Sequence, residues 1–148
     1  MKLNAVEAGE GPPVALLHGL FGQAGNFGAV QRRLAATHRM IALDLRNPAA
    51  RPHAEGMGYA AMARDVLETL DGLGALPCRL VGHSMGGKVA MMAALTRPQA
   101  VARLVVADIA PVAYPPRLRG YLAAMRAVAL APGLTRAAAD AALQGEVA

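Results

Sequence analysis

The segment Gly82-His83-Ser84-Met85-Gly86 constrains this chain more than any other, because it joins an apolar stretch to one with helical spacing. Residues 79–81 predict a strand, and the residues from Met85 onward predict a helix. A serine at such a junction sits on a sharp, strained turn, with its hydroxyl projecting above the end of the sheet. Glycine at positions 82 and 86 removes side chains that would crowd the adjoining strand and helix. The junction predicts Ser84 as a nucleophile; a turn that only packs strand against helix is the alternative.

The rest of the chain alternates between short apolar stretches and amphipathic ones. This alternation predicts an α/β fold with a mostly parallel sheet and flanking helices. Residues 14–17 are wholly apolar, as expected of a central strand that is buried on both faces. Strands are predicted at residues 3–8, 14–17, 39–43, 79–81 and 104–107. Helices are predicted at residues 59–73 and 85–96, with an earlier one that Asn26 caps and that places Phe27, Val30 and Leu34 on one face.

Two stretches depart from this alternation. Residues 46–58 contain prolines and glycines and predict a loop. From Pro111 onward the composition changes, with Pro115-Pro116 followed by alanine-rich segments at residues 121–130 and 136–143 that predict helices. We therefore predict a core at residues 1–110 and the start of a helical cap or lid at residues 111–148.

The charge and cysteine content of the chain argue against several classes of function. The 148 residues suit one domain, and 15 Lys and Arg against 10 Asp and Glu give a net charge of +5. The arginines are scattered rather than clustered, which argues against nucleic-acid binding. Cys78 is the only cysteine, so an intrachain disulfide or a cysteine-rich metal site is excluded. No metal or organic cofactor is implied.

The distribution of apolar residues along the chain also predicts where in the cell the protein is found. The first 13 residues lack the apolar core of a secretory signal. No apolar stretch approaches the ~20 residues that a membrane-spanning helix needs. These features predict a cytoplasmic protein without a membrane span.

A second motif, His18-Gly19-Leu20-Phe21-Gly22, follows the apolar run at residues 14–17. Acyl transfer builds negative charge on a carbonyl oxygen, and paired backbone N–H groups stabilise that charge. Leu20 and Met85 are the residues whose N–H groups we expect to form this oxyanion hole. His18 and Gly19 are expected to support the loop, and His83 is expected to pack beside the serine rather than act as a base.

The order of these motifs resembles one known group of proteins. HGLFG, DLRN, VGHSMGGKVAM and VVADIAPVAY, in this order, resemble small bacterial esterases of the α/β-hydrolase superfamily, in particular the YbfF-like group. The resemblance runs over residues 1–143 and covers the first part of that family's usual length. It implies hydrolysis of a small carboxylic ester or thioester through an acyl-enzyme. One departure is the Pro-Ala-Ala-Arg at residues 48–51, where the family has a His-Gly-x-Ser turn.

A serine needs a histidine base and a carboxylate that orients the base, in the chain order serine, acid, histidine. Asp108 ends the predicted strand after Ser84, and the resemblance makes it the first choice for the acid. Capping of the strand end is its alternative role. No histidine follows Ser84, since the four are His18, His38, His53 and His83. We therefore expect a truncated form without catalytic turnover, which self-associates through the exposed edge of its sheet.

Three rival functions remain at this stage. Residues 82–88 match the first seven positions of a phosphate-binding loop, but Val89 replaces the hydroxyl that would hold Mg²⁺. A hydrolase-like scaffold that only binds a partner would explain the absent base equally well. A hydrolase or lyase that cleaves carbon–carbon bonds would use the same serine.

Overall fold

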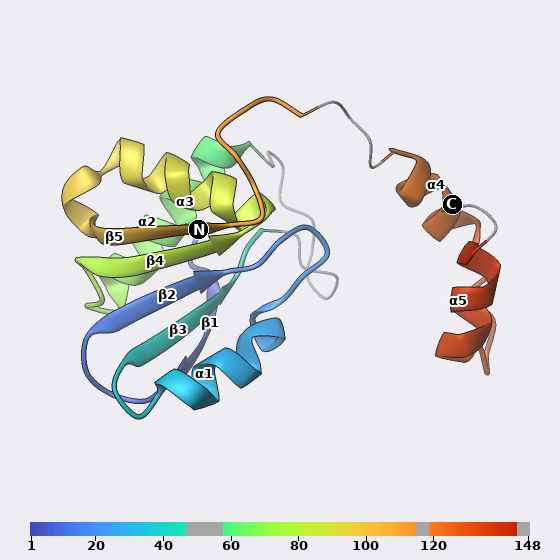
Figure 1. The fold of residues 1–148 in the computed structure, drawn as a ribbon, viewed down its shortest axis with the longest axis horizontal. Helices are drawn as coiled ribbons and strands as arrows, with labels where there is room; N and C mark the ends of the chain where they lie inside the picture. Colours follow the sequence, from blue (N-terminus) through green and yellow to red (C-terminus); the bar gives the residue numbers. More distant parts are fainter. Residues whose placement is uncertain (47–57, 115–118, 145–148) are drawn as a thin grey trace. The chain divides into compact units, whose positions relative to one another are not determined.

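The computed structural model describes residues 1–46, 58–114 and 119–144. The chain divides into two compact units, Met1–Pro111 and Val112–Ala148. The first unit contains a five-stranded sheet in the order β1-β3-β2-β4-β5 (Figure 1). The strands are β1 (Asn4–Ala8), β2 (Pro13–Leu17), β3 (Arg39–Asp44), β4 (Cys78–His83) and β5 (Val101–Ala107).

The sheet is mostly parallel, which confirms the predicted class. β2 pairs with β3 and with β4 in parallel, and β4 pairs with β5 in parallel. β1 alone runs antiparallel, with Asn4 opposite Asp44 and Ala8 opposite Met40. The carboxyl ends of the parallel strands lie along one side of the sheet, which we call its carboxyl edge. The chain leaves β2, β3, β4 and β5 at this carboxyl edge.

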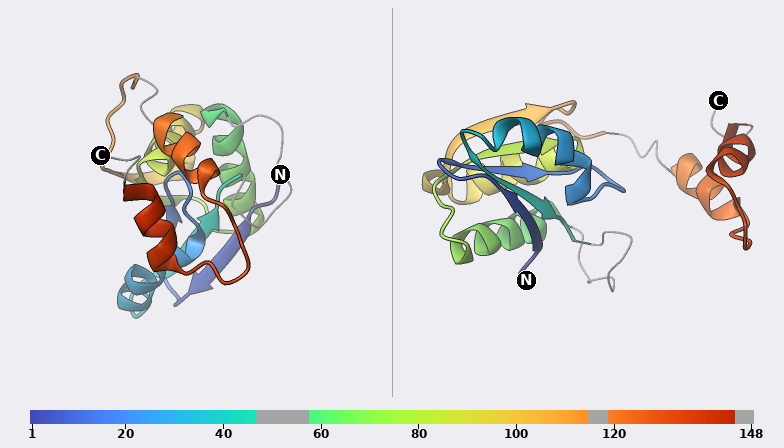
Figure 2. Two further views of the ribbon diagram at one scale, coloured as in Figure 1. Left: turned by 90° about the vertical axis from the view of Figure 1, so that its right-hand side faces the viewer. Right: turned by 90° about the horizontal axis from the view of Figure 1, so that it is seen from below.

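Helices cover both faces of the sheet (Figures 1 and 2). On one face lie α2 (Tyr59–Gly72) and α3 (Met85–Thr96), and on the other lie the short 3₁₀ helix η1 (Ala24–Phe27) and α1 (Gly28–Leu34). A second 3₁₀ helix, η2 (Pro98–Ala100), leads into β5. Alternating residues of β2 supply both cores: Ala15 and Leu17 face α2 and α3, while Val14 and Leu16 face η1.

The larger core lies between the sheet and α2. Met62, Val66 and Leu70 are buried there, which confirms the predicted apolar side of this helix. Cys78, at the start of β4, belongs to the same core, and burial raises the pKa of its thiol to about 11. The thiol therefore stays protonated at neutral pH.

A partly buried ion pair attaches the end of β3 to α2. Arg46, two residues beyond β3, binds both carboxylate oxygens of Asp65, and its Nη2 donates to Oδ1 at 2.9 Å. The amino group of Met1 also binds this carboxylate. Burial of Asp65 acts to raise its pKa, but the hydrogen bonds from Arg46 and Met1 outweigh burial and leave the pKa below its ordinary value.

The start of α1 differs from the prediction. Asn26 does not cap this helix; it lies inside η1, where its Oδ1 accepts a hydrogen bond from the Gln23 N–H group at 2.7 Å. Local bonding of the short amide side chain favours this tight turn before the α-helix begins. Of the predicted apolar face, Phe27 packs against the core, whereas Val30 and Leu34 are exposed. Gln31 is buried instead, and its Nε2 donates to the Val6 carbonyl oxygen at 2.8 Å.

Several strands also begin or end at other residues than predicted. β4 extends to His83, so that the turn before α3 consists of Ser84 alone, and β5 begins three residues earlier than predicted, at Val101. Of the loop predicted at residues 46–58, including the departure at residues 48–51, residues 47–57 lie outside the described part of the chain.

The second unit contains two helices, α4 (Arg119–Ala127) and α5 (Arg136–Gln144). α4 ends three residues before the predicted end at residue 130. Pro132 explains the difference, because a proline ring clashes with the carbonyl group four residues earlier in a helix. Within the described residues, no helix has the length and apolar character to cross a membrane.

Candidate active site

Ser84 forms a one-residue turn between β4 and α3, at the carboxyl edge of the sheet. Its backbone has φ 51° and ψ −118°, a conformation that residues other than glycine rarely adopt. Hydrogen bonds hold the turn: the Ser84 N–H donates to the Ala107 carbonyl at 2.9 Å, and the Ser84 carbonyl accepts from Gly87 N at 2.9 Å. This serine is therefore fixed at the junction of β4, β5 and α3.

Glycines on both sides make this turn sterically feasible. A Cβ at Gly82 would lie 2.3 Å from the Gly86 carbonyl oxygen, and a Cβ at Gly86 would lie 2.3 Å from the Leu17 carbonyl oxygen. Gly87, which lies outside the Gly-x-Ser-x-Gly motif, has a similar role, since a Cβ there would lie 2.6 Å from a methyl group of Ile109. No rearrangement of a flexible side chain relieves the two clashes with backbone atoms.

The loop after β2 is held by His18, which is buried. His18 Nε2 accepts a hydrogen bond from the Leu45 N–H group at 3.0 Å. Its other ring nitrogen, Nδ1, lies 2.8 Å from the Gly19 carbonyl oxygen and must therefore carry the proton. A neutral imidazole in this tautomer satisfies both contacts, so that both ring nitrogens are engaged in structural hydrogen bonds.

This loop lies against the serine turn. A Cβ at Gly19 would lie 3.2 Å from His83 Nδ1 and 3.3 Å from Ser84 Cβ. Gly22 N donates to the Gly19 carbonyl at 3.1 Å and closes the loop into a tight turn. The two motifs that lie far apart in the sequence are therefore neighbours in the fold.

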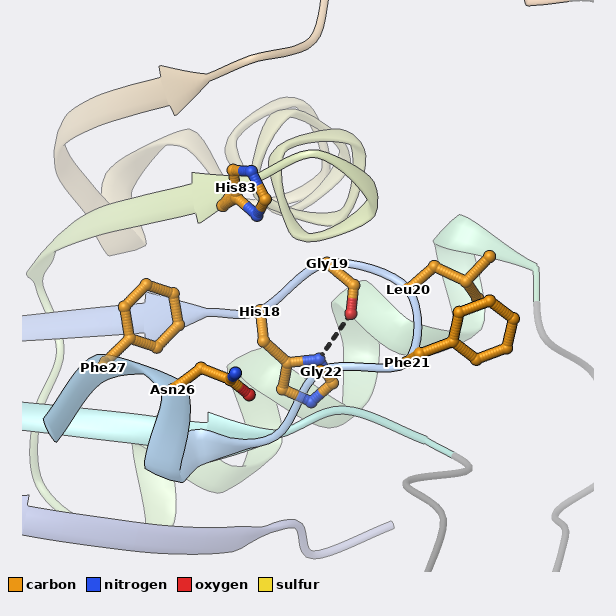
Figure 3. A pocket seen from close by; sticks show the side chains of 8 residues that line it. All are labelled: His18, Gly19, Leu20, Phe21, Gly22, Asn26, Phe27 and His83. Atoms are coloured by element: carbon orange, nitrogen blue, oxygen red, sulfur yellow. Dashed lines mark hydrogen bonds between the residues drawn. The ribbon is translucent and has the colours of Figure 1, made fainter. Parts of the chain in front are cut away.

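The loop, η1 and His83 line an open pocket of about 360 Å³ (Figure 3). Its lining within the described residues comprises His18, Gly19, Leu20, Phe21, Gly22, Asn26, Phe27 and His83. Leu20, Phe21 and Phe27 give it apolar walls. Asn26 and Phe27 were predicted only as the start of a helix, and no sequence signal near them indicates a pocket. The residues that line the pocket do not include Ser84, Met85 or Asp108. Ser84 and Met85 follow His83 in the chain, and Asp108 lies close to the His83 ring.

His83 lies beside the serine turn, with its ring against Gly19, and it also lines the pocket. Its side chain is 51% exposed, and its Nε2 lies 3.8 Å from Asp108 Oδ2. The extension of β4 explains why this ring faces the pocket. Val81 packs against the same core cluster as Phe27, and His83, two residues further along the strand, points to the same face of the sheet.

Asp108 immediately follows β5 and is strained in the same way as Ser84. Its φ is +56°, and its side chain is 87% exposed. The Ser84 N–H to Ala107 carbonyl bond attaches the residue before Asp108 to the serine turn. Asp108 thus lies at the end of β5, beside the serine turn, and the polar group near its carboxylate is the His83 imidazole.

The backbone N–H groups of Leu20 and Met85 remain available at this edge. Met85 is the first residue of α3, and such an N–H group has no acceptor within its own helix. The hydrogen bonds of the described residues include none from the Leu20 N–H group. The amino end of α3 also carries a partial positive charge that favours an anion there.

The described residues form no cluster of metal ligands. Within residues 1–46, 58–114 and 119–144, no three His, Cys, Asp or Glu side chains come together as metal ligands. The geometry also disfavours a phosphate-binding loop, because α3 already begins at Met85. Residues that would have to form an open loop around a phosphate are instead helical.

Comparison with known proteins agrees with this geometry. A family model for the alpha/beta hydrolase fold matches residues 12–143. Esterase YbfF of Escherichia coli (strain K12) is 38% identical over 147 residues, which are 95% of this chain and 58% of that protein. The sn-1-specific diacylglycerol lipase ABHD11 of Mus musculus is 45% identical over 121 residues, which are 79% of this chain and 39% of that protein.

A solved structure gives the same result. A marine microorganism esterase superimposes with a TM-score of 0.89 and 32% identity, over 99% of this chain and 59% of that one. The chain thus spans about two fifths to three fifths of the length of these relatives. The match over residues 12–143 and the arrangement of the sheet lead to one conclusion: the chain belongs to the α/β-hydrolase fold family.

Proposed function

We propose that this chain is the nucleophile-bearing part of a serine hydrolase that acts on carboxylic esters or thioesters. The observation that carries the proposal is the strained turn at Ser84, held between backbone atoms by Gly82 and Gly86. Strain of this kind persists only where the surrounding structure enforces it, and it is common at active sites. The relatives named esterase and diacylglycerol lipase support the same chemistry.

In this mechanism the Ser84 oxygen attacks the carbonyl carbon of the substrate, while a base takes the hydroxyl proton. The tetrahedral intermediate then expels the alcohol or thiol, which receives that proton, and leaves an acyl group on Ser84. Water attacks the acyl-enzyme with help from the same base and releases the acid. No metal or organic cofactor takes part in these steps.

The Leu20 and Met85 N–H groups would hold the negatively charged oxygen of the intermediate. Both lie at the carboxyl edge of the sheet, and neither is engaged elsewhere as described above. Loss of one such donor costs about 3–4 kcal/mol of transition-state stabilisation. Leu20, Phe21 and Phe27 would contact the apolar part of the substrate, since they form walls of the neighbouring pocket.

Asp108 is the proposed acid that orients the base. Its positive φ and its position beside the serine turn support this role. The base itself is not among residues 85–148, which contain no histidine. In this proposal it comes from chain outside residues 1–148, and residues 112–148 form the start of a cap.

The non-catalytic scaffold remains the second candidate. Only one observation favours it, the absence of a histidine after Ser84. It leaves unexplained why the turn at Ser84 and the N–H groups of Leu20 and Met85 are arranged as they are. A hydrolase or lyase that acts on carbon–carbon bonds would share this arrangement, and no feature of the pocket favours it. A cytoplasmic location also stays a prediction.

The test is hydrolysis of p-nitrophenyl butyrate by the complete gene product and by residues 1–148 alone. We expect the complete product to turn over, and Ser84→Ala to lower kcat/KM by about 10⁴-fold or more. Residues 1–148 should give no turnover that depends on Ser84. Thr96→Ala, which removes an exposed hydroxyl group at the end of α3, is the control and should retain full activity. Equal rates for the wild type and Ser84→Ala in the complete product would contradict the proposal.

A further inference from the structure

Asn26 lines the pocket with a hydrogen-bond donor that the local fold does not use. Its Oδ1 accepts the hydrogen bond from the Gln23 N–H group at 2.7 Å, and an N–H group can be accepted only by the oxygen of the amide. This bond fixes which way the amide is turned, so that Nδ2 faces away from Gln23. In the described part of the chain, Nδ2 makes no hydrogen bond. Figure 3 shows the amide group pointing from η1 toward the side of the pocket where His18 lies.

The rest of the pocket lining is mostly apolar or already bonded. Both ring nitrogens of His18 are engaged in the hydrogen bonds described above. The His83 ring lies near Asp108, and the other walls are apolar side chains and glycines. The described residues that line the pocket include neither Lys nor Arg. A molecule that fills the pocket therefore meets apolar surface and one side-chain amide donor.

The turn at the start of η1 does not depend on the amide nitrogen of Asn26. A carboxylate at this position would accept the same hydrogen bond from Gln23. Its negative charge would also be favoured there, because residue 26 lies just before the amino end of α1. The fold thus uses the oxygen of this amide and leaves the nitrogen for another partner.

We propose that Asn26 is a specificity-determining residue that selects esters with an uncharged acceptor oxygen, such as a ketone or ether oxygen, on an otherwise apolar chain. The inference rests on the function proposed above, because it concerns the substrate of the same site. An oxygen of this kind accepts a hydrogen bond from Nδ2. A plain hydrocarbon chain displaces water from Nδ2 and gives it no acceptor, and a site built to bond a polar group discriminates against the analogue that lacks it.

The test uses ester pairs that differ at one position of the chain. On the acyl side, p-nitrophenyl levulinate carries a ketone oxygen that p-nitrophenyl pentanoate lacks. On the alcohol side, methoxyethyl butyrate has an ether oxygen where butyl butyrate has a methylene group. We expect kcat/KM of the complete gene product to favour the oxygen-bearing ester of at least one pair, which also identifies the side of the substrate that enters the pocket.

The decisive variant is Asn26→Asp, which keeps the acceptor for the Gln23 N–H group and loses the donor. It should lower the preference for the oxygen-bearing ester by about tenfold, the usual effect of one hydrogen bond. Gln23→Glu is the matched control: it adds the same charge in the same turn, and Gln23 is not among the residues that line the pocket. It should change the preference by less than about twofold. An Asn26→Asp effect that is equal for both members of each pair would overturn the proposal, since the residue would then act only through the fold.

A second readout needs no turnover. In the Ser84→Ala variant, methyl levulinate or methoxyethyl butyrate should shift the side-chain amide signals of Asn26 in a nitrogen–proton NMR spectrum. Methyl pentanoate and butyl butyrate should leave these signals in place, and their loss in Asn26→Asp assigns them. Hydrolysis that does not depend on Ser84 would count against the proposed function, whereas Asn26 signals that neither oxygen-bearing ester shifts would overturn this inference alone.

Discussion

Ser84 and Asp108 adopt positive φ angles of 51° and 56° at the ends of neighbouring strands. Each such residue costs on the order of 1–3 kcal/mol, which the surrounding hydrogen bonds must offset. Here the Ser84 N–H group is bonded to the Ala107 carbonyl and the Ser84 carbonyl to the amide of Gly87. Among the described residues other than glycine, Phe21 in the loop after β2 has the third positive φ, at 60°. All three strained residues therefore gather around the serine turn and its neighbouring loop.

At the scale of the residue, the glycines of the turn allow a direct test. Gly86→Ala should lower the free energy of unfolding by more than about 3 kcal/mol, because its Cβ would lie 2.3 Å from the backbone oxygen of Leu17. Gly72→Ala, at the end of α2, is the control, since a Cβ there meets no atom within 4 Å. It should be neutral or stabilise by up to about 1 kcal/mol. Urea unfolding measures both changes, and equal midpoints for the two variants would contradict the geometry.

At the scale of the element, the attachment of α2 to the end of β3 depends on Asp65 and Arg46. The pKa of Asp65 is lower in the folded chain than in the unfolded one, for which about 4 is usual. The unfolded state therefore binds more protons in acid. The stability from this pair is complete above about pH 4 and is lost as the pH falls through the folded-state pKa.

Asp65→Asn should thus destabilise the chain by about 1–3 kcal/mol at pH 7, because it weakens the charge-assisted hydrogen bonds that this carboxylate accepts from Arg46 and Met1. The difference from the wild type should shrink toward pH 2. Asp71→Asn, on the same helix, removes the exposed pair with Arg97 at 3.5 Å and should cost less than about 1 kcal/mol. Urea unfolding at several pH values gives these quantities. A difference between wild type and Asp65→Asn that is constant from pH 7 to pH 2 would refute the assignment.

The sequence predicts the elements of the core well, and the reason is periodicity. The wholly apolar run of β2 and the spacing of Met62, Val66 and Leu70 report burial directly. Elements near the site are predicted less well, because short polar contacts determine them. Asn26 is bonded to the Gln23 amide and forms part of η1, and His83 belongs to β4 and faces the pocket.

The sequence motifs predict which residues come together in the site, but they do not predict the orientation of the side chains. The spacing of Gly82, Ser84 and Gly86 predicts the turn, and the HGLFG motif predicts the neighbouring loop. The 3.8 Å approach of His83 to Asp108 depends on where β4 ends and on the strained backbone of Asp108. Neither property is encoded in a local pattern.

At the scale of the whole molecule, β5 pairs only with β4 in the described part of the chain and forms one edge of the sheet, with β1 at the other. Leu104 and Val105 on this strand are exposed. An apolar edge of this kind pairs readily with another strand, whether from the same protein or from a second copy.

We therefore expect residues 1–148 to self-associate at tens of micromolar, by order of magnitude. Val105→Lys should reduce this association, since a charged residue on an edge strand opposes pairing. Val30→Lys places the same charge at an exposed valine of α1 and should leave association unchanged. Sedimentation velocity measures the distribution of species. A wild-type chain that remains a folded monomer would contradict the prediction.

The central claim is that Ser84 is the nucleophile of an acyl-transfer site, and covalent labelling tests it most directly. Ser84 is the only serine in the 148 residues, so a fluorophosphonate adduct within them can be assigned by peptide mass spectrometry. We predict stoichiometric modification of Ser84 in the complete gene product, none in Ser84→Ala, and slow or no modification of residues 1–148 alone, where the base is missing. A catalytically active gene product in which the label spares Ser84 would contradict the account.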